Sequence, residues 1–199
     1  MTCPQSSGAA RLLVVPGLHD SGPTHWQSWL QGLHRGAVRV QQRDWSRGDL
    51  ERWSARIANT VERHGGETWV VAAHSFGCLA LAHHLAANPG SPIVAALLVA
   101  PADPDRFGIA GSLPAQRLPR PTTMVTSSSD PWMRLPQAQA WARRWGSQLY
   151  HLGDAGHINT ESGFGPFPYA QRWVAAAQQK LARERRFERA AWSEWSFAI

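Results

Sequence analysis

Lysine is nearly absent from this 199-residue sequence, which holds a single one, Lys180, beside nineteen arginines. Charged residues make up only 17% of the chain, whereas hydrophobic residues make up 43%. A composition so low in charge and so rich in apolar side chains excludes a disordered chain and a coiled coil. Together with the length, it predicts one domain over residues 1–199 with a sizeable buried core.

Cysteine is scarce as well, with Cys3 near the start and Cys78 inside an apolar stretch. Two cysteines placed so differently exclude the disulfide framework of a small secreted domain and favour a reducing compartment. Residues 1–10 lack the cationic start and long apolar core of a signal peptide, and no uncharged apolar run reaches eighteen residues. We therefore expect a cytoplasmic protein with no membrane partner.

The formal net charge is +6, from 20 basic and 14 acidic residues. Residues 1–100, 101–179 and 180–199 each carry two more basic than acidic side chains, so the excess is spread evenly. The dense basic run at 180–189 has neither the Cys-His spacing of a zinc finger nor an aromatic RNA-binding motif. This run is typical of a solvated helix face, and we expect no nucleic-acid partner.

Apolar runs of strand length alternate with helical patterns along the chain. The six runs lie at residues 11–16, 37–41, 68–73, 93–100, 122–127 and 148–152. Continuous rather than alternating hydrophobicity is typical of parallel strands that are buried on both faces. Amphipathic helical spacing recurs at residues 49–64, 135–145 and 169–181. The alternation predicts an α/β fold with a single, mostly parallel sheet and helices on both faces.

The run at residues 68–73 continues into a turn with Ser75 at its apex and then into an apolar helical pattern. This arrangement is typical of a nucleophile elbow, which needs small residues two places before and two places after the serine. Ala73 and Gly77 hold these places, although alanine replaces the usual glycine at the first. An N-cap role for Ser75 at the following helix is the alternative.

An acid and a histidine follow later strands in the order that a hydrolase of this kind requires. Asp130 lies on the loop after the run at 122–127, and His157 lies on a glycine-rich loop after the run at 148–152. Serine, acid and base in this chain order are typical of the α/β-hydrolase triad. The pattern predicts Ser75 as nucleophile, Asp130 as orienting acid and His157 as general base.

Three other aspartates compete with Asp130 for the role of the acid. Asp154 shares the loop of His157, where capping a turn is the plainer role. Asp103 and Asp105 follow the preceding strand, where some hydrolases of this fold place the acid. We rank Asp130 first.

Two backbone N–H groups are expected to form the oxyanion hole, those of Phe76 after the serine and Leu18 after the first strand. The connection at residues 101–121 is rich in proline and glycine and is long enough to line a substrate pocket. With 199 residues there is room for a minimal lid or none. Candidate pocket residues are Trp132 and Phe107, with Leu18, Phe76, Ile109 and Leu113 in neighbouring segments.

The nine histidines do not form a metal-binding pattern. His83 and His84 are adjacent, so they point to different faces of a helix, and no H-E-x-x-H spacing occurs. We expect no metal and no organic cofactor.

Together these motifs resemble the small α/β-hydrolase family of serine hydrolases typified by retinoblastoma-binding protein 9 and its bacterial relatives. The matching stretches are VVPGLHDSGPTHWQSWL, VVAAHSFGCLA, LLVAPADPDRF, SSSDPW and GDAGHINTESGFGPFP, within about residues 12–181. The resemblance implies a carboxylesterase-like enzyme with Ser75, Asp130 and His157 as its triad. It also implies that His25 and Trp26 pack behind the oxyanion loop.

Two functions are therefore open. The first is hydrolysis of small esters or amides through an acyl-enzyme on Ser75, and the alternative is a catalytically weak binding or scaffold protein on the same fold. The basic extension at residues 181–199 lies outside the resemblance and ends in Trp192, Trp195 and Phe197. These apolar residues either fold back or contact a second subunit, so a monomer and a homodimer both remain open.

Overall fold

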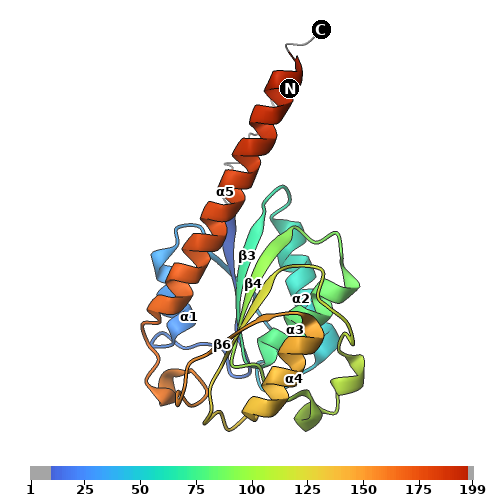
Figure 1. Cartoon of the computed structure of the whole chain (residues 1–199). Coiled ribbons are helices and arrows are strands. Elements are labelled where there is room, and N and C mark those ends of the chain that lie inside the picture. Colours follow the sequence, from blue (N-terminus) through green and yellow to red (C-terminus); the bar gives the residue numbers. More distant parts are fainter. Residues whose placement is uncertain (1–9, 197–199) are drawn as a thin grey trace.

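The computed structural model describes residues 10–196, with side chains to residue 187. Its centre is one six-stranded sheet with the order β2-β1-β3-β4-β5-β6 (Figure 1). The strands are β1 Arg11–Val15, β2 Val38–Arg39, β3 Trp69–His74, β4 Ile93–Val99, β5 Thr122–Thr126 and β6 Gln148–His151. Every neighbouring pair is parallel, which confirms the predicted sheet and the position of each strand.

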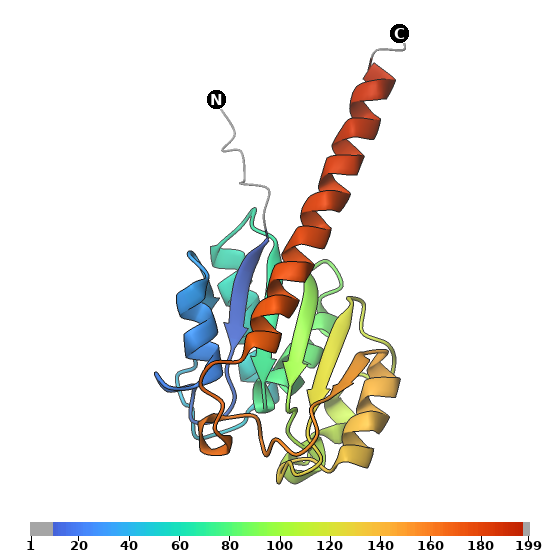
Figure 2. The same ribbon diagram turned by 60° about the vertical axis from the view of Figure 1, so that its left-hand side comes forward.

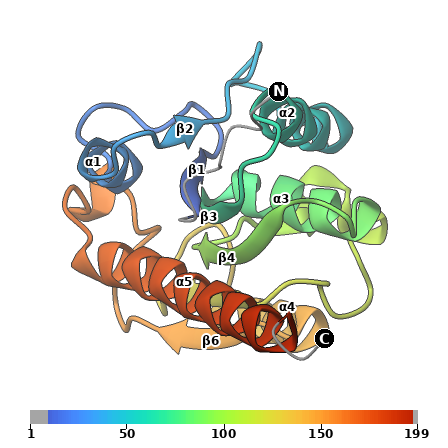
Figure 3. The same cartoon turned by 90° about the horizontal axis from the view of Figure 1, so that it is seen from above.

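Helices cover both faces of the sheet (Figure 3). They are α1 Trp26–Leu33 and α5 Pro168–Ser196 on one face, and α2 Leu50–Arg63, α3 Phe76–Ala87 and α4 Leu135–Trp145 on the other. Successive residues of a strand point to opposite faces, so Val70 packs with the α1 and α5 side and Val71 with the other. The core therefore consists of two apolar layers separated by the sheet.

Helix α2 illustrates why the predicted segments fold as they do. Its apolar positions recur every three or four residues, and the side chains at those positions, Leu50, Trp53, Ile57 and Val61, are buried. The Asp49 side chain accepts the N–H of Arg52 at 3.1 Å and caps the start of the helix.

Two elements differ in length from the predictions. Strand β2 has only two residues. The Val40 N–H still donates to the Val14 carbonyl at 2.9 Å, and the chain leaves the sheet edge after this bond. Helix α5 has 29 residues and begins beside the carboxyl ends of the strands, and its far end extends past the sheet (Figure 2). The predicted basic continuation is thus part of one helix.

The surroundings of Trp192, Trp195 and Phe197 lie outside the side chains that the structure describes. Among the described residues, Phe187 on α5 is 75% exposed. None of the helices within residues 10–196 combines the length and the apolar character needed to cross a bilayer.

Candidate active site

Ser75 lies at a sharp turn between β3 and α3. Its backbone has φ 52° and ψ −125°, a left-handed φ that costs energy in a non-glycine residue and is typical of a nucleophile elbow. A Cβ on Gly77 would lie 2.3 Å from the Pro16 carbonyl oxygen, so only glycine fits at that place. The Ser75 side chain does not cap α3, which argues against the N-cap alternative.

The structure brings Ser75, His157 and Asp130 together at the carboxyl edge of the sheet. The Nε2 atom of His157 lies 2.9 Å from Ser75 Oγ, and its Nδ1 lies 2.9 and 3.1 Å from the two Asp130 carboxylate oxygens. A carboxylate only accepts, so Nδ1 carries the proton and Nε2 accepts the hydroxyl hydrogen of Ser75. All three side chains are buried or nearly so, which strengthens these bonds.

The competing aspartates have other partners. Asp154 accepts a hydrogen bond from the Ser129 hydroxyl. Asp103 caps the short 3-10 turn that contains Asp105 and accepts the Gln137 amide at 3.0 Å. Among the described residues, Asp130 is the carboxylate that contacts His157.

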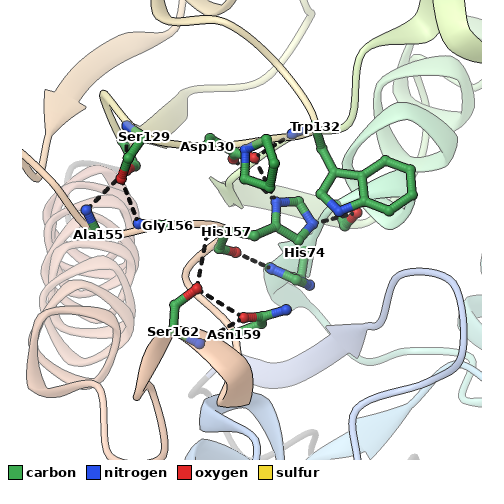
Figure 4. A network of polar contacts seen from close by, with 12 residues as sticks. His74, Ser129, Asp130, Trp132, Ala155, Gly156, His157, Asn159 and Ser162 are labelled. Carbon is green, nitrogen blue, oxygen red and sulfur yellow. Dashed lines mark hydrogen bonds and ion pairs between the residues drawn. The ribbon is translucent and has the colours of Figure 1, made fainter.

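Serines join the loop of the acid to the loop of the histidine. Ser127 Oγ accepts the N–H of Ala155 at 2.9 Å. Ser129 Oγ accepts the N–H of Gly156 at 3.0 Å, as Figure 4 shows. The role of this serine run was not predicted from the sequence. The signal was present, because three consecutive serines before an aspartate offer the short side-chain acceptors that turns use.

The two backbone N–H groups that the sequence suggests for an oxyanion hole are those of Leu18 and Phe76. Within residues 10–196, neither Leu18 nor Phe76 uses its N–H in a hydrogen bond. Phe76 is the first residue of α3, so its N–H has no helical acceptor and lies at the positive end of the helix dipole. A Cβ on Gly17 would lie 2.7 Å from the Ser75 Cβ, which shows how closely the Leu18 loop approaches the nucleophile.

Arg39, on the edge strand β2, is bonded to the loop at residues 16–22 that contains Leu18. Its guanidinium bonds to the Asp20 carboxylate at 2.8 Å and to the Ser21 carbonyl at 2.7 Å. It also reaches the side chains of Ser28 and Gln31, on α1, at 2.7 and 2.9 Å. The loop needs such support, because Asp20 has a left-handed φ of 61°. Sequence reasoning missed Arg39, because a cation on an edge strand has no local signature of what it contacts.

Three imidazoles lie side by side in the site. The ring of His74 is 4.8 Å from that of His157 and 4.9 Å from that of His25. Burial, and then the nearby Arg39 charge, lower the pKa of His25 to about 4. Burial likewise holds the pKa of His74 well below its ordinary value of 6.5. At neutral pH both residues are uncharged neighbours of His157.

A cavity of about 270 Å³ opens in front of Ser75. Trp132 and Phe107 line it, as the sequence analysis expected, and so does Leu18. Phe76 is buried between Trp53 and Phe107 and offers only its backbone.

The connection at residues 101–121 forms two short 3-10 turns, Pro104–Phe107 and Ala110–Ser112. Its apolar residues do not all face the site, because Leu113 is buried in the core and Ile109 packs against it. Neither residue is among those that line the cavity. They instead anchor the connection that presents Phe107.

The described residues contain no group of three or more His, Cys, Asp and Glu side chains suited to a metal ion. His83 lies 3.2 Å from Glu51, whereas His84 faces Ser91 at 3.1 Å. The two histidines thus occupy different sides of α3.

Comparison with known proteins gives matches of family and of fold. The family described as serine hydrolase matches residues 12–176. A YdeN-like hydrolase from Pectobacterium atrosepticum is 38% identical, with a TM-score of 0.82 over 88% of this chain and 94% of its own.

More distant structures share the fold. The ydeN gene product of B. subtilis is 18% identical, with a TM-score of 0.69 over 84% of this chain and 97% of its own. The RedJ thioesterase of Streptomyces coelicolor is 14% identical, with a TM-score of 0.59 over 87% and 91%. No curated protein matches the chain.

Proposed function

Because the chain belongs to the serine hydrolase family, we propose that it is a carboxylesterase-like enzyme that cleaves small esters or amides through an acyl-enzyme on Ser75. The observation that carries this proposal is the unbroken hydrogen-bond relay from Ser75 through His157 to Asp130. We also propose that it belongs to the branch typified by retinoblastoma-binding protein 9, on the five stretches that resemble that family.

In the first half of the reaction, Ser75 Oγ attacks the substrate carbonyl while His157 Nε2 takes its proton. The imidazolium is stabilised by Asp130, which accepts from Nδ1. The carbonyl oxygen becomes an oxyanion, which in this proposal accepts hydrogen bonds from the N–H groups of Leu18 and Phe76. Collapse of this intermediate breaks the bond to the leaving group, which receives the proton from His157.

In the second half, water replaces the leaving group. His157 removes a proton from the water, whose oxygen attacks the acyl carbon, and the proton then passes to Ser75 Oγ as the acid is released. The small cavity and the apolar surfaces of Trp132 and Phe107 favour short acyl or aryl groups over long lipid chains. Every bond in this scheme is made and broken by the chain's own residues and water.

Turnover of chromogenic esters of increasing acyl length tests this function. We expect hydrolysis of the short members by the wild type and a loss of roughly 10⁴- to 10⁶-fold in Ser75→Ala and His157→Ala. Ser46→Ala, on an exposed loop, is the matched serine control and is expected to keep full activity. A loss of turnover of less than tenfold in the two triad variants would contradict the assignment of the triad. A wild type that cleaves none of the esters would favour the alternative of a binding or scaffold protein.

A further inference from the structure

His74 precedes Ser75 in the chain, and the mechanism above does not use it. Its side chain is only 5% exposed, and its Nε2 lies 3.0 Å from the backbone carbonyl oxygen of His157. A carbonyl oxygen only accepts, so Nε2 of His74 carries the proton and donates. One hydrogen bond therefore joins the residue beside the nucleophile to the main chain of the base.

The loop that carries His157 lies between strand β6 and the short 3-10 turn Thr160–Ser162. Gly156 and Ile158, on either side of the histidine, both have left-handed φ angles, of 53° and 48°. The N–H of His157 donates to Ser162 Oγ at 3.0 Å, within the same loop (Figure 4). The carbonyl of His157, in contrast, is bonded to His74 at the end of β3. This second bond connects the loop to the strand that carries the nucleophile.

The surroundings of His74 keep it in the form that this bond needs. The titratable groups that face it are the imidazoles of His157 and His25, at ring distances of 4.8 and 4.9 Å, and the Trp26 ring lies 6.0 Å away. Burial and the repulsion that a charged neighbour would exert both keep His74 neutral. A neutral His74 adds no second positive charge when His157 receives the serine proton.

We propose that His74 is a positioning residue, whose Nε2–H fixes the main chain of His157 so that its imidazole stays within hydrogen-bond distance of Ser75. This inference rests on the proposed function, because that distance matters only for proton transfer. Because His74 also borders the cavity in front of Ser75, kcat and KM are measured separately: positioning of the base changes kcat, whereas contact with the substrate would change KM.

Two substitutions at His74 distinguish the effect of its N–H donor from the effect of the size of its side chain. His74→Phe keeps a planar ring but has no N–H to donate. His74→Gln supplies an amide N–H, and its nitrogen is separated from Cβ by the same number of bonds as the Nε2 atom of histidine. For the shortest ester that the wild type cleaves, we expect His74→Phe to lower kcat by 10- to 100-fold with KM within twofold. We expect His74→Gln to recover kcat to within about fivefold of the wild type.

His84 provides the matched control, because it is also buried and neutral but bonds to Ser91, away from the site. His84→Phe and His84→Gln are expected to leave kcat within about twofold of the wild type. The proposal is overturned if folded His74→Phe keeps full kcat. It is overturned equally if His74→Gln is as slow as His74→Phe, because the donor would then have no role.

A spectroscopic measurement on the wild type needs neither substrate nor variants. In ¹⁵N-labelled protein the imidazole of His74 is expected to be the neutral Nε2–H tautomer from pH 8 to pH 5.5. An Nδ1–H tautomer, or titration near pH 6.5, would overturn the proposal even if His74→Phe failed to fold. If the wild type cleaves no ester, the proposed function fails, and so does the role of His74, whatever its tautomer.

Discussion

Buried neutral histidines tie the stability of this protein to pH at the scale of single residues. Burial lowers the pKa of His84 to about 4, as it does for His25 in the site. In the unfolded chain both groups take up a proton near pH 6.5. Between about pH 6.5 and pH 4 the unfolded state therefore binds more protons than the folded state, and acidification destabilises the fold.

His84→Gln tests this linkage away from the catalytic groups. The substitution removes one proton-binding site from the unfolded state, so the free energy of unfolding should fall less between pH 8 and pH 4.5. The reduction is expected to reach roughly 2–3 kcal/mol. Urea denaturation at the two pH values measures it, with His151→Gln on the exposed edge strand as control. An unchanged pH dependence would show that His84 is protonated in the folded protein.

The three residues of the proposed triad were the easier ones to predict. Ser75, Asp130 and His157 each follow a strand, and parallel strands bring their carboxyl ends to one edge, so chain order predicts their meeting. No comparable rule predicts the contacts that hold these residues in position. The His74 donor meets a carbonyl 83 residues away, and Arg39 meets a loop 19 residues away, so tertiary packing alone determines them.

At the scale of elements, the elbow depends on the close approach of α3 to the end of β1. The six strands and the main helices could be predicted, because continuous apolar runs and helical stripes are local patterns. Where α3 touches β1 could not be read from periodicity. The glycine at position 77 marks that contact, because any side chain there would meet the Val15 and Pro16 carbonyl oxygens.

Gly77→Ala tests the contact between the two elements. Its Cβ would lie 2.3 Å from one backbone oxygen and 2.6 Å from another, so α3 or β1 must shift. We expect a loss of roughly 1–3 kcal/mol in unfolding free energy and a displaced Ser75. Gly111→Ala has open space around it and is expected to change stability by less than about 0.5 kcal/mol. Equal stability of the two variants in chemical denaturation would contradict the account.

At the scale of the whole molecule, the site and the far end of the long helix α5 lie at opposite ends of the sheet. Ser75 lies at the carboxyl ends of the strands, whereas α5 starts there and extends past their amino ends (Figure 2). Within the described residues, the site is therefore covered by its loops alone.

Mass spectrometry after treatment with a fluorophosphonate tests the central claim most directly. All the serines of the chain meet the same reagent, so the one that is modified is identified as the nucleophile. The account predicts a single covalent adduct on Ser75, formed within minutes at pH 8, and its absence in Ser75→Ala. The exposed Ser46 serves as an internal control and should remain unmodified. A folded wild type that stays unlabelled, or an adduct on another serine, would contradict the assignment of Ser75 as the nucleophile.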